Sequence, residues 1–265
     1  FSTDSGTIKL DGNYPTGTDN VALGDTALDS IEAGGTNNTA IGDHAGTAIT
    51  TGDHNTAVGK DALLSNTTAG ANTAVGRNSM KDNTTGSDNT AIGESSLREN
   101  ETGCCNAVLG ENAMTLNTSG CYNTSIGSMS LHNNTTANNN TAVGYLALNA
   151  NTTGNSNTAV GVCSLDANTE GDGNSAVGRN ALAKNTTACY NVAVGYDSLF
   201  TNTTGHSNTA VGFNTMCVNT TGDCNVAIGK DALDSNTEGD CNTAIGTDAL
   251  QANTTASQNT AIGSR

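Results

Sequence analysis

Residues 140–156 read Asn-Thr-Ala-Val-Gly-Tyr-Leu-Ala-Leu-Asn-Ala-Asn-Thr-Thr-Gly-Asn-Ser, and variants of this 17-residue unit fill almost the whole chain. The unit opens with an Asn-Thr-Ala-Val/Ile-Gly pentad whose Asn and Gly do not vary along the chain. The pentads begin at Asn38, Asn55, Asn72, Asn89, Asn106, Asn123, Asn140, Asn157, Asn174, Asn191, Asn208, Asn225, Asn242 and Asn259. One further copy begins 18 residues earlier, at Asn20. A short, constant period is typical of a solenoid, in which each coil packs only on its two neighbours.

The composition excludes a helical or conventional globular domain. The 265 residues include one Pro, no Trp, 3% aromatic and 13% charged residues. Helices and large cores use more Leu, Phe, Lys and Glu, whereas Asn, Thr, Gly and Ala favour turns and close packing. Low-complexity repeats can also be disordered, but here the apolar residues hold strict register, which a disordered chain has no reason to keep.

The positions within one coil are numbered here from zero, at the Asn of the pentad. Positions three and eight are apolar, as in Val58 and Leu63. The Gly at position four and an Asn-Thr-Thr-Gly turn end two short extended runs. These features predict an all-β fold: a parallel β-solenoid (β-roll) of 17-residue coils, with two short strands per coil and coils about 4.8 Å apart.

Because identical coils stack on one another, the sequence predicts a role for several positions of the coil. The Val/Ile column at position three and the Leu/Met column at position eight should form a thin continuous core. Ala at positions two and seven should let the backbones approach closely. The Asn at position zero should donate a hydrogen bond to one rung and accept one from the next, forming a ladder.

The repeat also divides the chain. Residues 20–265 are predicted to form one continuous β-solenoid of 14 complete coils and a partial terminal coil. Residues 1–19 depart from the repeat and form an atypical coil, a cap or an assembly segment. They contain an alternating Thr7–Leu10 run, an Asp11-Gly12-Asn13 turn and the single proline, Pro15.

The pentad resembles the head repeat of trimeric autotransporter adhesins, and the longer motif at Asn140–Gly154 is similar to repeats of phage tail-fibre-like proteins. The resemblance covers residues 20–263. It implies a left-handed β-roll, often a homotrimer, on a projecting fibre that contacts other surfaces. The 17-residue unit is longer than the adhesin-head unit, and the sequence shows no stalk heptads, membrane anchor or C-terminal chaperone domain.

The charge pattern argues against nucleic acid and membranes as partners. The net charge is −16, and the nine Lys and Arg residues are scattered. No run of 18 apolar residues is present, so no membrane insertion is expected. Phe1 is an unusual translational start, which suggests a mature or trimmed chain. No cofactor is expected, although acidic turns at Glu170–Asp172 and Glu238–Asp240 leave calcium as an open alternative.

Eight cysteines indicate an oxidising compartment. Cys104 and Cys121 are 17 residues apart, as are Cys224 and Cys241, so each pair occupies one column on adjacent coils. A coil spacing of about 4.8 Å suits a disulfide, and we expect both pairs to form one. The other four, Cys105, Cys163, Cys189 and Cys217, could be free, interchain or cross-linked along the stack. The alternative is that all eight are buried small apolar residues.

No enzymatic constellation is visible, so the chain is not predicted to be an enzyme. The histidines are His44, His54, His132 and His206, and no recurring Ser, Cys or acidic neighbour accompanies them. His44 and His54 could meet near the N-terminal end, although solvated histidines in turns are the simpler interpretation.

Position eleven carries N-glycosylation sequons in ten coils. The acceptors would be Asn66, Asn83, Asn100, Asn117, Asn134, Asn151, Asn185, Asn202, Asn219 and Asn253. If this turn faces solvent, glycans would stand in a column. The alternative is that Asn-Thr-Thr-Gly is simply favourable turn chemistry, because Asn168 and Asn236 keep the Asn but have lost the sequon.

The resulting functional hypothesis is a self-assembling structural subunit of an extracellular fibre or filament, at a cell or virion surface. One alternative is an adhesin or tail-fibre-like head that binds a surface receptor or glycan. Another is an ice-binding solenoid, since Thr recurs at position one. The sequence stops inside a fresh coil after Gly263. We therefore expect copies of the chain to stack head to tail, with a lateral homotrimer through the Ala-rich face as a compatible arrangement.

Overall fold

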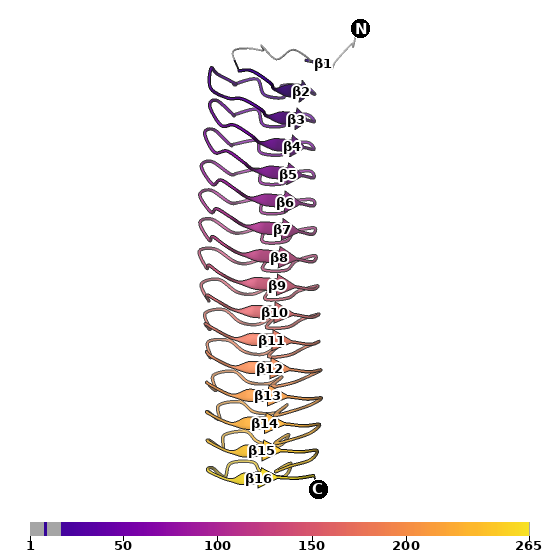
Figure 1. Cartoon of the computed structure of the whole chain (residues 1–265), viewed down its shortest axis with the longest axis vertical. Helices are drawn as coiled ribbons and strands as arrows, with labels where there is room; N and C mark the ends of the chain where they lie inside the picture. The colour runs from indigo at the N-terminus through magenta and orange to yellow at the C-terminus, as the bar shows by residue number, and fades with distance from the viewer. Residues whose placement is uncertain (1–7, 10–16, 265) are drawn as a thin grey trace. The chain divides into compact units, whose positions relative to one another are not determined.

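The computed structural model of this chain describes residues 8–9 and 17–264. The chain divides into two compact units, Phe1–Thr136 and Ala137–Arg265. Every regular element among the described residues is a β-strand (Figure 1). The first unit contains β1 Ile8–Lys9, β2 Val21–Leu23, β3 Thr39–Ile41, β4 Thr56–Val58, β5 Thr73–Val75, β6 Thr90–Ile92, β7 Ala107–Leu109 and β8 Thr124–Ile126. The second contains β9 Thr141–Val143, β10 Thr158–Val160, β11 Ser175–Val177, β12 Val192–Val194, β13 Thr209–Val211, β14 Val226–Ile228, β15 Thr243–Ile245 and β16 Thr260–Ile262.

The strands from β2 onward stack in parallel within each unit, and equivalent positions of successive coils pair. Thr158 lies opposite Ser175 and Ala159 opposite Ala176, a shift of one 17-residue unit. The same shift of 17 runs from β3 to β8 and from β9 to β16, and β2 pairs with β3 with a shift of 18. The predicted all-β parallel solenoid is confirmed.

Each coil contains one strand rather than the two expected. After the Gly at position four, the chain passes through consecutive turns in which positions six and eight both have positive φ, as at Asn180 (56°) and Leu182 (53°). The Asn180 N–H donates to Val162 O of the preceding coil at 3.0 Å. The Leu182 N–H donates to Ser198 O of the following coil, also at 3.0 Å. The second side is therefore hydrogen-bonded to both neighbouring coils without being extended.

Small and medium residues line the interior of a coil, including the Gly or Ala at position fourteen, and five of them are central. In the coil that begins at Asn174, these are Asn174, Ala176, Ala181, Leu182 and Asn185, each with an exposed fraction of 0%. Leu or Met at position eight is the only large side chain of this core. The close-packing role predicted for Ala at positions two and seven is correct, and these residues form the core itself.

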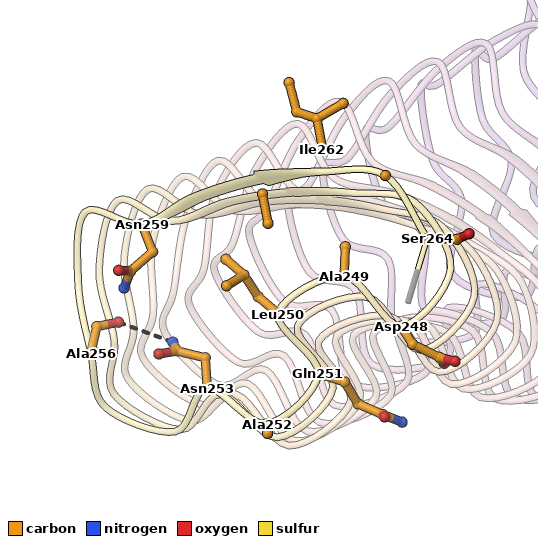
Figure 2. Close-up of a pocket in the computed structure, with 12 residues that line it drawn as sticks. Asp248, Ala249, Leu250, Gln251, Ala252, Asn253, Ala256, Asn259, Ile262 and Ser264 are labelled. Carbon is orange, nitrogen blue, oxygen red and sulfur yellow. Dashed lines mark hydrogen bonds between the residues drawn. The ribbon is translucent and has the colours of Figure 1, made fainter.

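The prediction that position three belongs to the core is wrong. Successive residues of a strand point to opposite faces, so a buried position two places positions one and three outside. Ala176 is fully buried, whereas Val177 is 41% exposed. Figure 2 shows the same arrangement in the last coil, where Ile262 points away from the interior and Leu250 points into it. The Ala residues at position two are internal for the same reason, so they do not form an outer contact face, and the homotrimer stays a prediction.

The backbone explains why position eight is Leu or Met and never Val or Ile. Position eight has φ of 47–53° wherever it carries Leu or Met. This left-handed conformation is especially unfavourable for β-branched residues. Unbranched side chains tolerate it, and their burial offsets the strain. Position three, in an extended conformation, takes the β-branched residues that strands favour.

Two columns of buried asparagine amides join the coils of each unit. At position zero, Asn174 N–H donates to Asn157 Oδ1 at 2.9 Å, and Asn174 Nδ2 donates to Ala188 O at 2.8 Å. At position eleven, Asn185 Nδ2 donates to Asn168 Oδ1 at 2.7 Å and to the same Ala188 O at 3.0 Å. The predicted ladder at position zero is confirmed, and the ladder at position eleven is a second one.

The Gly at position four is required by both its backbone and its surroundings. Gly161 has φ of 139°, and a Cβ there would lie 2.4 Å from Gly178 O of the next coil. No other residue satisfies both conditions.

The first two coils replace the second ladder with apolar packing. Position eleven is Ile31 or Ile49 instead of Asn, and both side chains are buried. Position eight of the second coil is Gly46, and Ile49 Cδ1 fills the space that a side chain there would occupy. Before these coils, β1 pairs with β2 in the antiparallel direction. The expected Asp11-Gly12-Asn13 turn and Pro15 lie outside the described residues.

The assignment of the core can be tested within one coil. Leu182→Ala should lower the free energy of unfolding by about 2–5 kcal/mol, because it removes a fully buried side chain. Val177→Ala should cost less than about 1 kcal/mol, because Val177 faces solvent. Urea unfolding monitored by circular dichroism measures both variants, and equal losses would contradict the core described above.

Candidate functional surfaces

The outer face of the strands is an uncharged surface, defined by positions one and three of β2–β16 and called here the outward sheet face. Position one is Thr, Ser, Ala or Val, and position three is always Val, Ile or Leu. The position-three side chains are half-exposed to exposed, for example Ile92, Leu109, Val160 and Ile228. The face therefore presents a column of branched apolar side chains to solvent beside a column composed mainly of hydroxyls.

Position five, at the corner that follows each strand, carries charges of both signs in the first unit: Asp25, Asp43, Lys60, Arg77, Glu94 and Glu111. Lys60 Nζ lies 2.7 Å from Asp43 Oδ2, and Arg77 pairs with Glu94 in the same column. The hydrogen bond from Lys60 lowers the pKa of the Asp43 carboxyl and raises the pKa of Lys60 itself. These pairs are solvent-exposed and contribute little to stability.

In the second unit half of the same column is apolar, and Arg179, Lys230, Thr247 and Ser264 occupy its other four positions. The apolar half contains Tyr145, Val162, Tyr196 and Phe213, all exposed. The rings of Tyr196 and Phe213 stack with their centroids 5.6 Å apart, and Arg179 Cζ lies 5.6 Å from the centroid of Tyr196. The outward sheet face of this unit is thus bordered by further apolar surface at position five.

Position fifteen forms a column of side-chain acceptors. The N–H of one residue donates to the side chain of its equivalent on the next coil. Cys189 N–H donates to His206 Nδ1 at 3.0 Å, His206 N–H to Asp223 Oδ1 at 2.6 Å, and Asp223 N–H to Asp240 Oδ1 at 2.8 Å. Ser, Asn, Asp, His and Cys all satisfy this requirement, which explains the variety of residues at this position.

The structure places the cysteines in three environments. Cys104 and Cys121 occupy position fifteen on adjacent coils with their Sγ atoms 2.9 Å apart, as the expected pairing requires. Cys224 and Cys241 occupy the exposed turn at position sixteen, with φ near 57° and 55°. The two disulfides stay predictions.

Four cysteines have no partner predicted from the sequence. Of these, Cys105 is exposed at position sixteen, and Cys189 belongs to the acceptor column. Cys163 and Cys217 are half-buried at positions six and nine. Burial and nearby aspartates raise the pKa of Cys217 to about 11. Hydrogen bonding to Cys121 and burial raise the pKa of Cys104 to about 12. Both are therefore protonated and unreactive at neutral pH.

The histidines do not form a common site. His44 Nδ1 lies 3.0 Å from Asp61 Oδ1 at position six, whereas His54 pairs with Asp53 at position sixteen. His132 Nδ1 lies 2.9 Å from Asn112 O. The proposed meeting of His44 and His54 is thus not found, because they occupy different columns.

The column of glycan acceptors at position eleven requires correction. Asn66, Asn83, Asn100, Asn117, Asn134, Asn151, Asn185, Asn202 and Asn219 each have an exposed fraction of 0%. Their amide nitrogens belong to the second ladder inside the coil, so they cannot carry a glycan in the folded protein. Asn253, in the last complete coil, is half-exposed, but its amide also donates to Asn236 Oδ1 at 2.9 Å.

The chain also contains sequons outside position eleven. Four further triplets match the sequon: Asn123 is buried in the position-zero ladder and Asn133 is half-exposed, whereas Asn37 and Asn139 are exposed. Asn37 and Asn139 lie in the left-handed turn just before the pentad, with φ of 58° and 60°. Tyr122 and Tyr190 project into solvent from the same turn position as Asn139, so bulky groups fit there. A search for every sequon, rather than for the repeating one, would have found them.

A hollow at the last coil is the uncovered interior of the stack. Figure 2 shows Leu250, Asn253 and Asn259 pointing into it, and Asn253 Nδ2 donates to Ala256 O at 3.0 Å. The next coil covers these positions elsewhere in the unit. The hollow is therefore the surface on which a further rung would stack, and its polar groups form no separate constellation.

No three His, Cys, Asp or Glu side chains lie close enough to hold a metal ion, within residues 8–9 and 17–264. In the two acidic turns, Asp172 Oδ1 accepts from Asn155 N–H at 2.6 Å, and Asp240 Oδ1 accepts from Asp223 N–H. These carboxylates serve the acceptor column. The same part of the chain has no helix long and apolar enough to cross a bilayer.

Comparison of the chain with known protein families, curated proteins and solved structures yields no match. The resemblance to adhesin heads and tail-fibre-like repeats rests on the sequence motif alone.

The geometry of the cysteine columns generates one prediction. Mass spectrometry of non-reduced peptides should find the links Cys104–Cys121 and Cys224–Cys241 after oxidation. Each link closes a loop of about 17 residues, worth roughly 3 kcal/mol in the chain-entropy model. In the reduced chain at neutral pH, Cys104 should react slowly with iodoacetamide because its raised pKa leaves little thiolate. Free thiols at all four positions after oxidation would disprove the pairing.

A second prediction concerns glycan position. If the chain passes through a eukaryotic secretory pathway and folds, glycans should occupy Asn37 and Asn139. The nine fully buried asparagines of position eleven should be unmodified. Glycopeptide mapping measures occupancy at each site, and Asn139→Gln should remove one glycan whereas Asn185→Gln should remove none. A folded chain with glycans at position eleven would contradict the buried ladder.

Proposed function

We propose that this chain is a structural subunit of an extracellular fibre or filament. The observation that carries the proposal is the uniformity of the interior. Within each unit, nearly every coil repeats the same Ala, Leu or Met and Asn columns, while variation is confined to outward positions. Such an arrangement makes a scaffold that can be lengthened coil by coil, because each coil needs only its two neighbours.

The proposed location outside the cell has two chemical supports. Paired columns of cysteine suit an oxidising compartment. The net charge of −16 keeps an elongating stack soluble without providing a basic surface for nucleic acid. Buried amide ladders are also well suited to an environment that contains proteases, since cleavage requires local unfolding of hydrogen-bonded coils.

The two alternative functions would use the outward sheet face. Ice binding needs a regular Thr column, and position one is interrupted by Ala107, Val192 and Val226. Receptor binding by an adhesin-like head would use the same exposed surface, and no individual contact in the structure favours it over self-assembly. Both stay predictions.

Immunogold electron microscopy of the source material tests the proposal. Antibodies raised against the purified chain should label fibres or surface projections on intact, unpermeabilised cells or virions. An antibody against a cytosolic protein of the same source serves as the control for integrity. Labelling that appears only in the interior of sectioned cells would overturn the extracellular structural role.

A further inference from the structure

The outward sheet face is the one extended surface whose composition the fold does not explain. A chain with 25 acidic and nine basic residues places none of them at positions one or three of β2–β16. The position-three side chains point away from the core and so contribute little to folding. Thr at position three would suit a solvent-exposed strand equally well, and the chain already has Thr at position one of most coils. Exposed apolar surface of this extent marks an interaction site.

Within the second unit, the face has the size of an apolar patch that marks an interaction site. Strands about 4.8 Å apart, with three residues of about 3.3 Å each, present about 50 Å² per strand. The eight strands of the second unit, β9–β16, together present roughly 400 Å². A standard interface uses about 800 Å² per partner, and the apolar residues at position five of the second unit extend the area.

The repeat identifies the partner. Branched side chains at position three recur once per coil, at the spacing of parallel strands. A partner surface interdigitates with them over many coils only if it has the same spacing. A second copy of this chain provides that spacing, the same lack of charge and a self-complementary surface.

We propose that the outward sheet face binds the outward sheet face of a second copy, with its centre in the second unit. This inference deepens the proposed fibre function and rests on it. The centre is assigned from position five. In the first unit, the exposed charges of Asp43, Lys60 and Glu94 border the face, and burying them would carry a desolvation cost. In the second unit, the exposed apolar groups of Tyr145, Val162, Tyr196 and Phe213 border it, and Arg179 and Lys230 are the two charged residues of that column, so a partner would bury fewer charges there.

Three outward substitutions test the interface directly. The variant Val160→Lys, Val177→Lys, Val194→Lys places three positive charges on one face, 36–41% exposed in the monomer. A matched control, Thr153→Lys, Thr187→Lys, Thr204→Lys, adds the same charge at exposed position thirteen in the same part of the unit. Like charges brought together in a face-to-face contact oppose association.

Analytical ultracentrifugation of the full chain over a range of concentrations provides the measurement. The unmodified chain and the Thr control should associate with the same dissociation constant, and the Val variant should associate at least about tenfold more weakly. Circular dichroism establishes that each variant is folded. If the Lys variant fails to fold, the isosteric variant Val160→Thr, Val177→Thr, Val194→Thr replaces it and should also weaken association.

Two results would overturn the proposal: an unmodified chain that stays monomeric at every concentration, or a folded Val variant that associates as tightly as the unmodified chain. Neither result affects the immunogold test of the extracellular fibre role, so the two failures are distinguishable. Association that is weakened equally by both Lys variants would also refute the assignment, since it would reflect net charge rather than the face.

Discussion

The paired columns of buried asparagine amides are the constraint on which the rest of the structure depends. An amide has both a donor and an acceptor, so one Asn per coil can satisfy the coil before it and the coil after it. Asp in the same column would bury like charges at about strand spacing, and Gln would displace the amide by one bond. At both positions the amide nitrogen also donates to the position-fourteen carbonyl, as Asn174 and Asn185 do to Ala188 O. The ladder tolerates one extra residue between Asn20 and Asn38, where the Asn38 N–H still donates to Asn20 Oδ1 at 2.8 Å, and every later coil keeps 17 residues.

These ladders also determine which apolar residues the coil can use. With two amides inside, the remaining interior accommodates two small residues and one side chain of the size of Leu or Met. The turn that brings position eight inward needs a left-handed backbone, as at Leu165 (φ 50°), and this conformation disfavours Val and Ile. In most coils the branched apolar residues are consequently outside, on the strand, with Val108, Ile31 and Ile49 as buried exceptions. Hydrophobicity alone predicts that the Val of the strand is buried and the Ala exposed, and the structure has the opposite arrangement.

Period, strand direction, register and the position-zero ladder could be predicted from the sequence, because they follow from repetition alone. Which face of the strand is buried could not be predicted. In a three-residue strand that contains Ala-Val, either residue could point inward, and only the thickness of the coil decides between them. The same ambiguity affected position eleven, where Asn151-Thr-Thr-Gly is good turn chemistry whether its Asn points outward or inward. Cys104 and Cys121 were placed in one column correctly because spacing determines columns, whereas His44 and His54 belong to different columns and spacing alone did not bring them together.

Once the internal requirements are assigned, most unusual residues have a structural reason. His206, Asp223 and Cys189 appear where the backbone needs any side-chain acceptor, so their presence does not indicate catalysis. Leu at a strained turn and Gly at position four serve the coil geometry. Val, Ile and Leu at position three have no such reason, because neither the backbone nor the core requires an apolar side chain on the solvent side of a strand. An apolar column that folding does not require, repeated in all fifteen parallel strands, is best explained by a contact outside the chain.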